Sequence, residues 1–385
     1  MPGHSALDPR SRRVKLFIAL LWGIGALAAT VQQGVLHQTN NFQIFRAASL
    51  HLLHGQDLYA AYPALHFDFY KYSPTFAFLF LPFALSPFWL SLFLWNLLGA
   101  GALYFALGAA LPPRVASVGR AIVFLDMFGS LQNMQSNALV AALIIYAFVA
   151  FERRHPVRGS LATAVGASIK IFPLASASFA IFHPRKARVV AALAMSAIVL
   201  VLLPLCVTAP SVFVAQYASW RAIEAKDAFD RGLSVMQMLQ LLLQRDWPNW
   251  PIQSFGVVAL LAPVLVRRQR WTDEGFRRLY LCSVLVFCVI FNHQSESPTF
   301  VIAVAGAAIW FASLPRRTPW EWALFTLVVV GTMLASTDVI PGAVRRAFFL
   351  PYHVKVVPCI VLWVELQRQL WRRGPAKSVF AAEAR

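Results

Sequence analysis

Long apolar runs alternate with short polar segments from about residue 14 to residue 371. A transmembrane helix needs about 20 apolar residues, and fewer where the helix packs inside a bundle. The pattern therefore predicts an all-α integral membrane protein, a multi-span helical bundle of about 12 spans. The expected spans are 14–36, 88–110, 120–133, 137–151, 160–170, 172–183, 189–207, 252–266, 276–291, 299–313, 321–337 and 354–371.

One further apolar segment, 74–86, is short and carries Pro74 and Pro82. Counting it as a span would place Arg114 and Arg120 outside the cell, against the tendency of basic residues to stay on the cytoplasmic side. We therefore expect a re-entrant or interfacial half-helix after the first outer loop. In a second outer segment, Val235 to Leu243 has the pattern of an interfacial amphipathic helix.

The composition fits a membrane protein, since 59% of the 385 residues are hydrophobic and only 13% are charged. A net charge of +18 would suit nucleic acid, but Arg and Lys lie in clusters between apolar runs. This is the positive-inside pattern, and it places both termini in the cytoplasm. We expect no nucleic-acid partner, a single integral domain over residues 1–375, and a cytoplasmic tail over residues 376–385.

The sequence has neither metal-ligand cysteine spacing nor a nucleotide-binding motif, so it gives no indication of a cofactor. None of the four cysteines has C-x-x-C spacing, and each lies in or beside an apolar run. They are interpreted as small buried hydrophobic residues rather than a disulfide or zinc set. The chain has no Walker loop, Rossmann glycine motif or H-E-x-x-H sequence. We expect neither a cofactor nor a metal.

The first outer loop, His37 to Tyr72, is rich in aromatic residues, carboxylates and histidines. Its part from Asn41 to His54 has helix-like apolar spacing, and Gly55 follows as a stop signal. The helix either lies passively on the bundle or presents Asn41 or Arg46 to a cleft.

Charged residues follow in the same loop. Asp57 and Asp68 are either solvated surface groups or part of a site, and Lys71 directly precedes the half-helix. A cation at that place could hold an anionic lipid head group.

Lys170 lies in an apolar stretch that Pro173 interrupts. An ammonium at membrane depth is costly and usually marks a pathway, a ligand or a paired carboxylate. The basic cluster after it suggests that the stretch goes out and back, with Lys170 near the outer bend. It either snorkels to the interface or binds a phosphate or a carboxylate.

Two further outer turns carry candidate groups. His293 and Glu296 lie three residues apart between two apolar runs and suit acid–base work, or else form a plain polar turn. Arg345 and Arg346 depart from the positive-inside trend, and they either grip a phosphate or carboxylate or are ordinary surface charge.

Five motifs follow one another in an order that resembles a known family: G-Q-D-L-Y (55–59), Y-K-Y-S-P (70–74), L-Q-N-M-Q-S-N-A-L (131–139), E-R-R-H-P-V-R-G (152–159) and A-S-I-K-I-F-P (167–173). Together with the first span and the Pro-rich half-helix, this order resembles bacterial glycosyltransferase family 87 over roughly residues 14–340. Its best-described relatives are polyprenyl-phosphate-mannose-dependent mannosyltransferases.

The resemblance implies a GT-C architecture in the bacterial cell (inner) membrane with its site on the extracytoplasmic face. It implies a hexosyltransferase that uses a polyprenyl-phosphate sugar donor and a glycan or glycolipid acceptor, with no cofactor and no metal. Inversion at the sugar is expected by resemblance only.

The chain departs from the family at one important position. The family usually has Asp where this chain has Asn41, and a carboxylate in this loop typically acts as base toward the acceptor hydroxyl. Because an amide does not take up that proton, either Asp57, Asp68 or Glu296 takes it, or the chemistry is altered or absent. His293 matches the family's later histidine in position, but the surrounding motif differs.

We expect these groups to meet in one outer cavity that opens to lipid. Asp68 or Glu296 would accept the proton of the acceptor. Cations would hold the donor phosphate: Lys71, Lys170, and Arg345 or Arg346.

Two other functions stay open: a transporter or flippase for a lipid-linked substrate, and a non-catalytic membrane relative. A transporter would have polar residues on both sides of the membrane, whereas here they concentrate on the outer side. Asn41 is the residue that favours the non-catalytic relative.

Overall fold

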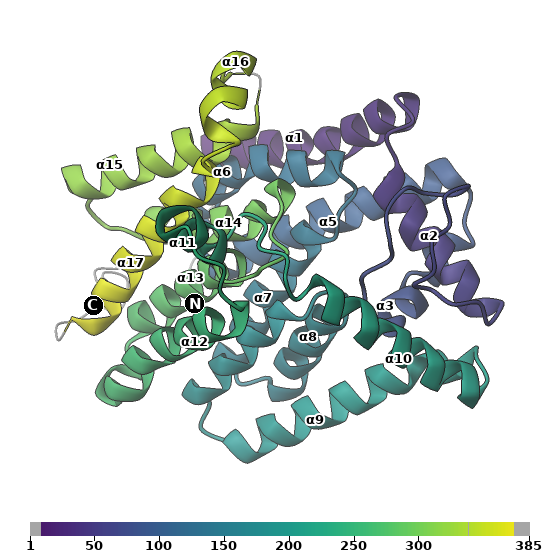
Figure 1. Cartoon of the computed structure of the whole chain (residues 1–385). Helices are drawn as coiled ribbons and strands as arrows, with labels where there is room; N and C mark the ends of the chain where they lie inside the picture. The colour runs from purple at the N-terminus through teal and green to yellow at the C-terminus, as the bar shows by residue number, and fades with distance from the viewer. Residues whose placement is uncertain (1–8, 338, 373–385) are drawn as a thin grey trace.

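The computed structural model describes residues 9–337 and 339–372, and this part of the chain contains helices and no strand (Figure 1). The longer helices are α1 (Pro9–Val35), α5 (Phe88–Ala110), α6 (Pro113–Gln132), α7 (Asn137–Glu152), α9 (Lys186–Leu202), α10 (Pro210–Asp227), α12 (Asn249–Val266), α13 (Glu274–Ile290) and α17 (Val357–Trp371). The shorter α-helices are α2 (Asn40–Leu53), α3 (Pro74–Leu79), α4 (Leu81–Ala84), α8 (Pro156–Ile169), α11 (Val235–Leu243), α14 (Val301–Ala312), α15 (Pro319–Val328) and α16 (Gly342–Val344).

Helices of 3₁₀ or π type connect several of these elements. They are η1 (Phe172–Phe182), η2 (Leu203–Cys206), η3 (Arg268–Arg270), η4 (Ser297–Phe300), η5 (Val329–Met333), η6 (Leu334–Ser336), η7 (Arg345–Phe349) and η8 (Val354–Val356).

Six helices of the described chain are long and apolar enough to cross a membrane, or up to seven if a bent pair is one span. They are Arg12–Val35, Phe88–Ala110, Pro113–Gln132, Lys186–Cys206, Asn249–Val266 and Pro319–Ser336, and the bent pair is Gly342–Phe349 with Val354–Trp371. The expectation of about 12 spans is not confirmed. Several predicted spans form shorter helices, such as η1 with 11 residues and α14 with 12, below the length of about 20 residues that a regular span needs.

The segment predicted as a re-entrant half-helix forms two short helices, α3 and α4. Ser73 caps α3 by accepting a hydrogen bond from the backbone N–H of Phe76, and Pro74 occupies the first turn, where no N–H donor is needed. A re-entrant position in the membrane is not confirmed. The segment Val235 to Leu243 is helical as predicted and forms α11.

The centre of the bundle is made by helices with apolar residues on all sides. Every residue of α14 is buried, and α14 packs against α13, α6 and α7. A helix that is hydrophobic all round can only be stable when it is surrounded by protein or lipid. These central helices end at polar turns, and two of those turns build the site described below.

Helices α2, α3 and α10 lie together on the right of Figure 1, away from the end of α17. An aromatic cluster fixes α2 there, since the ring of Phe45 contacts Tyr72, Phe76, Phe80 and Trp95 with centroids 5.0–5.9 Å apart. Edge-to-face contacts of this kind add to the stabilisation that burial provides. The loop between α2 and α3 is thereby held over the bundle.

Two predictions concern the division of the chain into a domain and a tail, and the state of its cysteines. The predicted tail 376–385 lies outside the described residues, and the single domain over 1–375 stays a prediction. The four cysteines are unpaired, and three of them are buried as predicted, but Cys206 in η2 is exposed.

Candidate active site

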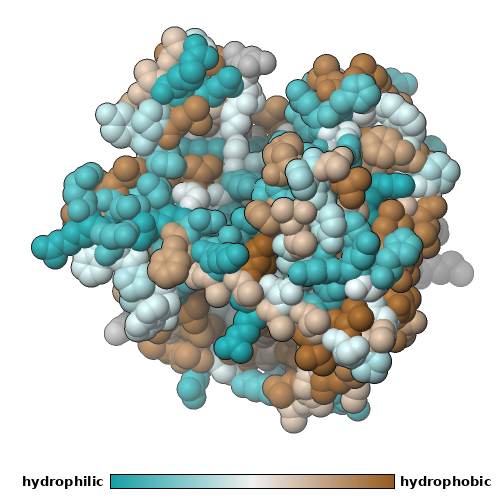
Figure 2. All heavy atoms as spheres, turned by 45° about the vertical axis from the view of Figure 1, so that its right-hand side comes forward, coloured by the Kyte–Doolittle hydropathy of each residue, from teal (hydrophilic) through white to brown (hydrophobic). Residues whose placement is uncertain are grey.

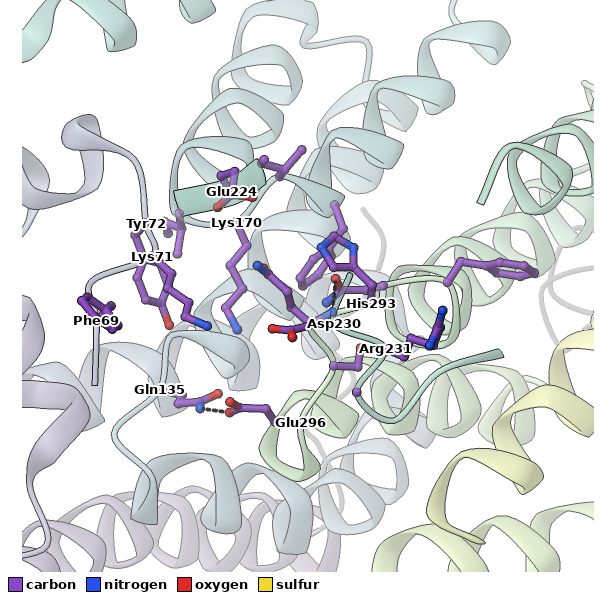
Figure 3. A pocket seen from close by; sticks show the side chains of 18 of the residues that line it. Phe69, Lys71, Tyr72, Gln135, Lys170, Glu224, Asp230, Arg231, His293 and Glu296 are labelled. Carbon is purple, nitrogen blue, oxygen red and sulfur yellow. Dashed lines mark hydrogen bonds between the residues drawn. The ribbon is translucent and has the colours of Figure 1, made fainter. Parts of the chain in front are cut away.

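A cavity of about 590 Å³ lies where the segment 37–72, predicted above as the first outer loop, meets four other segments. Those segments are the turn between α6 and α7, the break between α8 and η1, the segment from α10 to α12, and the turn between α13 and η4. Figure 3 shows the ammonium groups of Lys71 and Lys170 pointing into one space near Glu296. Such a concave site with a few convergent polar groups has the form of a binding or active site.

The cavity brings together most of the residues that the sequence singles out, from positions far apart in the chain. Six of them line it: Asn41, Asp68, Lys71, Lys170, His293 and Glu296. Asp57 lines a neighbouring cavity instead. Arg345 and Arg346 lie in η7 and are not among the lining residues of either cavity.

Lys170 occupies the break between α8 and η1. Its backbone is extended, with φ −143° and ψ 142°, so the chain changes direction there before Pro173. The hydroxyl of Ser73 donates to the carbonyl of Ser168, which ties this break to the first outer loop. Lys170 therefore lies outside the six candidate spans and points into the cavity.

The ammonium of Lys170 donates to an amide and not to a carboxylate. Its Nζ donates to Oδ1 of Asn137 at 2.8 Å. Burial lowers the pKa of Lys170 to about 8, and the charge of Glu296 opposes that shift. Lys170 is half-buried, and a partly desolvated cation whose direct partner is neutral is suited to binding an anionic ligand.

A chain of hydrogen bonds connects Lys170 with Glu296. Asn137, which accepts from Lys170, donates through Nδ2 to Oε1 of Gln135. Gln135 in turn donates through Nε2 to Oε2 of Glu296 at 2.6 Å (Figure 3). The side chain of Glu296 also accepts the backbone N–H of Thr299 and so caps η4. These two hydrogen bonds occupy the carboxylate of Glu296.

Asp68 has fewer hydrogen bonds to its carboxylate. Its Oδ1 accepts the backbone N–H of Phe69 at 2.7 Å, and its backbone carbonyl lies 2.6 Å from Nδ1 of His66. The side chain of Asn40 holds the adjacent residue by accepting the N–H of Phe67. The backbone around Asp68 is thus fixed, while its side chain is exposed and accessible to a ligand.

Lys71 forms an ion pair with Asp227 at 2.8 Å. Burial by itself would lower the pKa of Lys71, but the hydrogen bond and charge of Asp227 raise it above its usual value. Asp227 also accepts from Nε2 of Gln294 at 3.1 Å. One carboxylate thereby joins the first outer loop, the end of α10 and the turn after α13.

His293 lies in the same turn, and burial lowers its pKa. Its Nδ1 is 3.1 Å from Nε2 of Gln253. Because an amide nitrogen is a donor, Nδ1 acts as the acceptor and the proton of the neutral ring is on Nε2. That Nε2 is buried without a hydrogen-bond partner in the described chain. His293 is therefore a neutral group at the cavity wall rather than a charged one.

Asn41 has a structural partner. Its Nδ2 donates to the backbone carbonyl of Asn133 at 2.9 Å, and this bond connects the start of α2 with the turn after α6. An ionised carboxylate at this position would face a carbonyl oxygen and could not donate. This contact explains why position 41 carries an amide. An amide is, however, unsuited to accepting the proton of an acceptor hydroxyl.

One side of the cavity is apolar and reaches the outer surface of the bundle. Ile171 and Val257 line the cavity and are themselves 51% and 45% exposed. Val257 belongs to α12, one of the candidate membrane spans. Phe287 of α13 and Phe291, which follows the end of that helix, continue the apolar wall. Figure 2 shows hydrophobic and hydrophilic side chains side by side on the face brought forward, with a hollow between two raised parts.

Sequence reasoning did not assign roles to several groups that the structure places here. Gln135, Asn137 and Asp227 hold the candidate residues, and Glu224 and Asp230 line the cavity. Their only signal in the sequence is their position in polar segments between apolar runs. No group of three or more His, Cys, Asp or Glu in the described part of the chain is arranged to hold a metal ion.

A second cavity of about 280 Å³ adjoins the first, between the first outer loop and α10. Phe69 and Lys71 line both cavities. The ion pair of Lys71 with Asp227 therefore lies at the boundary between them.

Comparison with known proteins gives one finding. A model of glycosyltransferase family 87 matches residues 69–291, which is more than half of the chain and includes most of the cavity. No curated protein matches the sequence.

Proposed function

The chain belongs to glycosyltransferase family 87 and is a membrane glycosyltransferase, and we propose that its donor is a polyprenyl-phosphate sugar bound in the larger cavity. The observation that supports this donor is Lys170, a half-buried cation hydrogen-bonded to an amide, in a cavity that also has an apolar opening. An isoprenoid phosphate has an anionic head and an apolar tail. The head would meet Lys170, and the tail would leave past Ile171 and Val257 into lipid.

The proposed reaction is a single displacement at the anomeric carbon. An acceptor hydroxyl forms the new glycosidic bond as the bond from the anomeric carbon to the phosphate oxygen breaks. The bonding electrons leave with the polyprenyl phosphate, whose growing negative charge Lys170 stabilises. The proton of the hydroxyl passes to a carboxylate.

Asp68 is the better candidate for that carboxylate. The carboxylate of Glu296 accepts hydrogen bonds from Gln135 and from the first turn of η4, whereas Asp68 is exposed. Glu296 would instead help to hold Lys170 in its charged state, as the effect of its charge on the pKa of Lys170 indicates. The product is a glycosylated glycan or glycolipid, and we place the reaction at the extracytoplasmic face of a bacterial cell membrane, with both termini in the cytoplasm.

The test is a transfer assay with the purified full-length chain and a polyprenyl-phosphate [14C]mannose donor. We expect the wild type to release or transfer the label, and Asp68→Asn to lower kcat by about 100-fold or more, because positioned general bases contribute on the order of 10²–10⁴. Lys170→Gln should weaken donor binding as well as slow the reaction. Glu274→Gln serves as the control, since this carboxylate is on the exposed side of α13 and lines neither cavity.

Two outcomes would contradict the proposal. Donor binding without cleavage by the wild type would support the non-catalytic relative that Asn41 suggests. Full transfer activity in both Asp68→Asn and Glu296→Gln would show that the proton goes elsewhere.

A further inference from the structure

The second cavity has a largely polar and aromatic lining. It includes the carboxylates Asp57 and Asp227, the hydroxyl of Ser219, the ammonium of Lys226 and the ring of Phe69. Asp57 already has local partners, since Oδ1 accepts the N–H of Tyr59 at 3.1 Å and Oδ2 is 3.4 Å from Oγ of Ser219. That second contact is long, so Oδ2 retains capacity to accept a ligand hydroxyl.

We propose that this second cavity is the acceptor subsite and that it binds a sugar ring. The inference rests on the proposed function of the larger cavity. A sugar presents hydroxyl donors to carboxylates and a face of C–H groups to an aromatic ring. Asp57, Asp227 and the exposed ring of Phe69 offer both kinds of surface in one place.

The two cavities differ in the cation that they offer to an anionic ligand. In the second cavity, Lys71 is paired with Asp227, and the carboxylate of Asp57 shares the lining with the ammonium of Lys226. The formal charges of these four groups cancel, so the lining gives a phosphate no net attraction and suits a neutral polyol. We therefore assign the anionic donor to Lys170, whose hydrogen-bond partner is an amide, and the neutral acceptor to the second cavity.

The boundary between the cavities has the geometry that a transfer reaction needs. Phe69 lines both spaces, and its neighbour Asp68 lines the donor cavity. An acceptor that stacks on Phe69 would direct one hydroxyl past this ring toward Asp68. Separation of Lys71 from Asp227 would then join the two cavities at the point where the new bond forms.

A steric block on α10 tests the subsite without removing any chemical group. Ala222 lines the second cavity only, so Ala222→Trp fills it. Ala225→Trp is the matched control, because Ala225 is on the same helix, is exposed and lines neither cavity. Asp57→Asn is the milder second variant, since Asn retains an oxygen that can accept the N–H of Tyr59.

The probes are methyl mannoside and octyl mannoside, with the full-length protein in nanodiscs. We expect Ala222→Trp to raise the acceptor KM by about tenfold or more. Asp57→Asn should raise it by about threefold to tenfold, because a hydrogen bond to a neutral amide oxygen is weaker than one to a carboxylate. The affinity for the polyprenyl-phosphate donor should stay within about twofold of wild type in both. Ala225→Trp should match wild type. Tighter binding of octyl mannoside than of methyl mannoside would identify a glycolipid acceptor, and equal binding a glycan.

An unchanged acceptor KM in Ala222→Trp would overturn the subsite, and so would an equal loss of donor affinity. If the wild type cleaves no donor at all, the proposed function fails and equilibrium binding of the mannosides decides the second cavity alone. Weaker binding in Ala222→Trp than in Ala225→Trp then supports the subsite, and equal binding refutes it.

Discussion

The two lysines that line the larger cavity have different partners, and this difference suggests different roles for them. Lys71 is paired with the carboxylate of Asp227, so its charge is already compensated. Lys170 donates to the amide of Asn137, and no carboxylate of the described residues is within ion-pair distance of it. Of these two lysines, Lys170 is thus the one whose charge a phosphate would complement.

Donor affinity should therefore depend on pH through Lys170. Its pKa of about 8 means that the ammonium is charged below this pH and neutral above it. Donor binding should be constant near neutral pH and weaken by up to about tenfold per pH unit above pH 8, because one proton is linked to binding. Equilibrium binding of the polyprenyl-phosphate donor between about pH 6.5 and pH 9.5 measures this.

Lys170→Arg is the control for this measurement. A guanidinium stays protonated over the whole range, so the variant should bind the donor with little change up to pH 9.5. The assignment would be wrong if Lys170→Arg lost affinity at the same pH as the wild type.

At the scale of elements, the sequence predicts most of the helices and turns that build the site but not which turns contact each other. Apolar periodicity predicts α2 and α5, and in α5 the bounds 88–110 agree with the structure. Polar residues between apolar runs identify the turns that carry Gln135 and Glu296. The contact between those two side chains joins positions 161 residues apart, and no local pattern records which turns meet when a bundle packs.

The close contact of Gly232 with the turn after α13 is such a non-local feature. Gly232 has a φ of +46°, and a Cβ at this position would be 2.5 Å from the carbonyl oxygen of Ser295. The next residue, Leu233, donates its N–H to the same oxygen at 2.7 Å. The segment after α10 is thereby held against the turn that carries His293 and Glu296.

Gly232→Ala should consequently disturb the site as well as the fold. The left-handed backbone and the clash together should lower stability by about 1–3 kcal/mol, and displacement of the turn should lower kcat in the transfer assay. Thermal unfolding and kcat are the measurements. Gly101→Ala is the control, since its Cβ would meet no atom within 4 Å, and alanine is favoured over glycine inside a helix. A Gly232→Ala protein with wild-type stability and activity would contradict this account.

For the whole molecule, apolar runs indicate that the chain is a membrane protein but do not count its spans. The long runs of α1, α5, α9 and α12 satisfy the length requirement, whereas α7, η1 and α14 are shorter. Burial explains why the number of apolar runs does not equal the number of membrane spans. A short helix at the centre of a bundle, such as α14, is as apolar as a span because protein surrounds it on every side.

The orientation proposed from the basic clusters can be tested by cysteine labelling in a Cys206→Ser background. Phe229, on the segment beside the cavity, and Arg153, after α7, are both exposed. A membrane-impermeant maleimide applied to intact cells should label Phe229→Cys and leave Arg153→Cys unlabelled until the membrane is opened. The reverse pattern would invert the topology and place the cavity in the cytoplasm.

The apolar side of the larger cavity, at Ile171 and Val257, has a consequence for kinetics. A carrier whose tail stays among acyl chains reaches the protein by diffusing in two dimensions. The concentration that governs saturation is then the mole fraction of the carrier in the bilayer, not its amount per litre. Diluting vesicles with buffer would leave the turnover rate unchanged, whereas diluting the carrier with inert phospholipid would lower it.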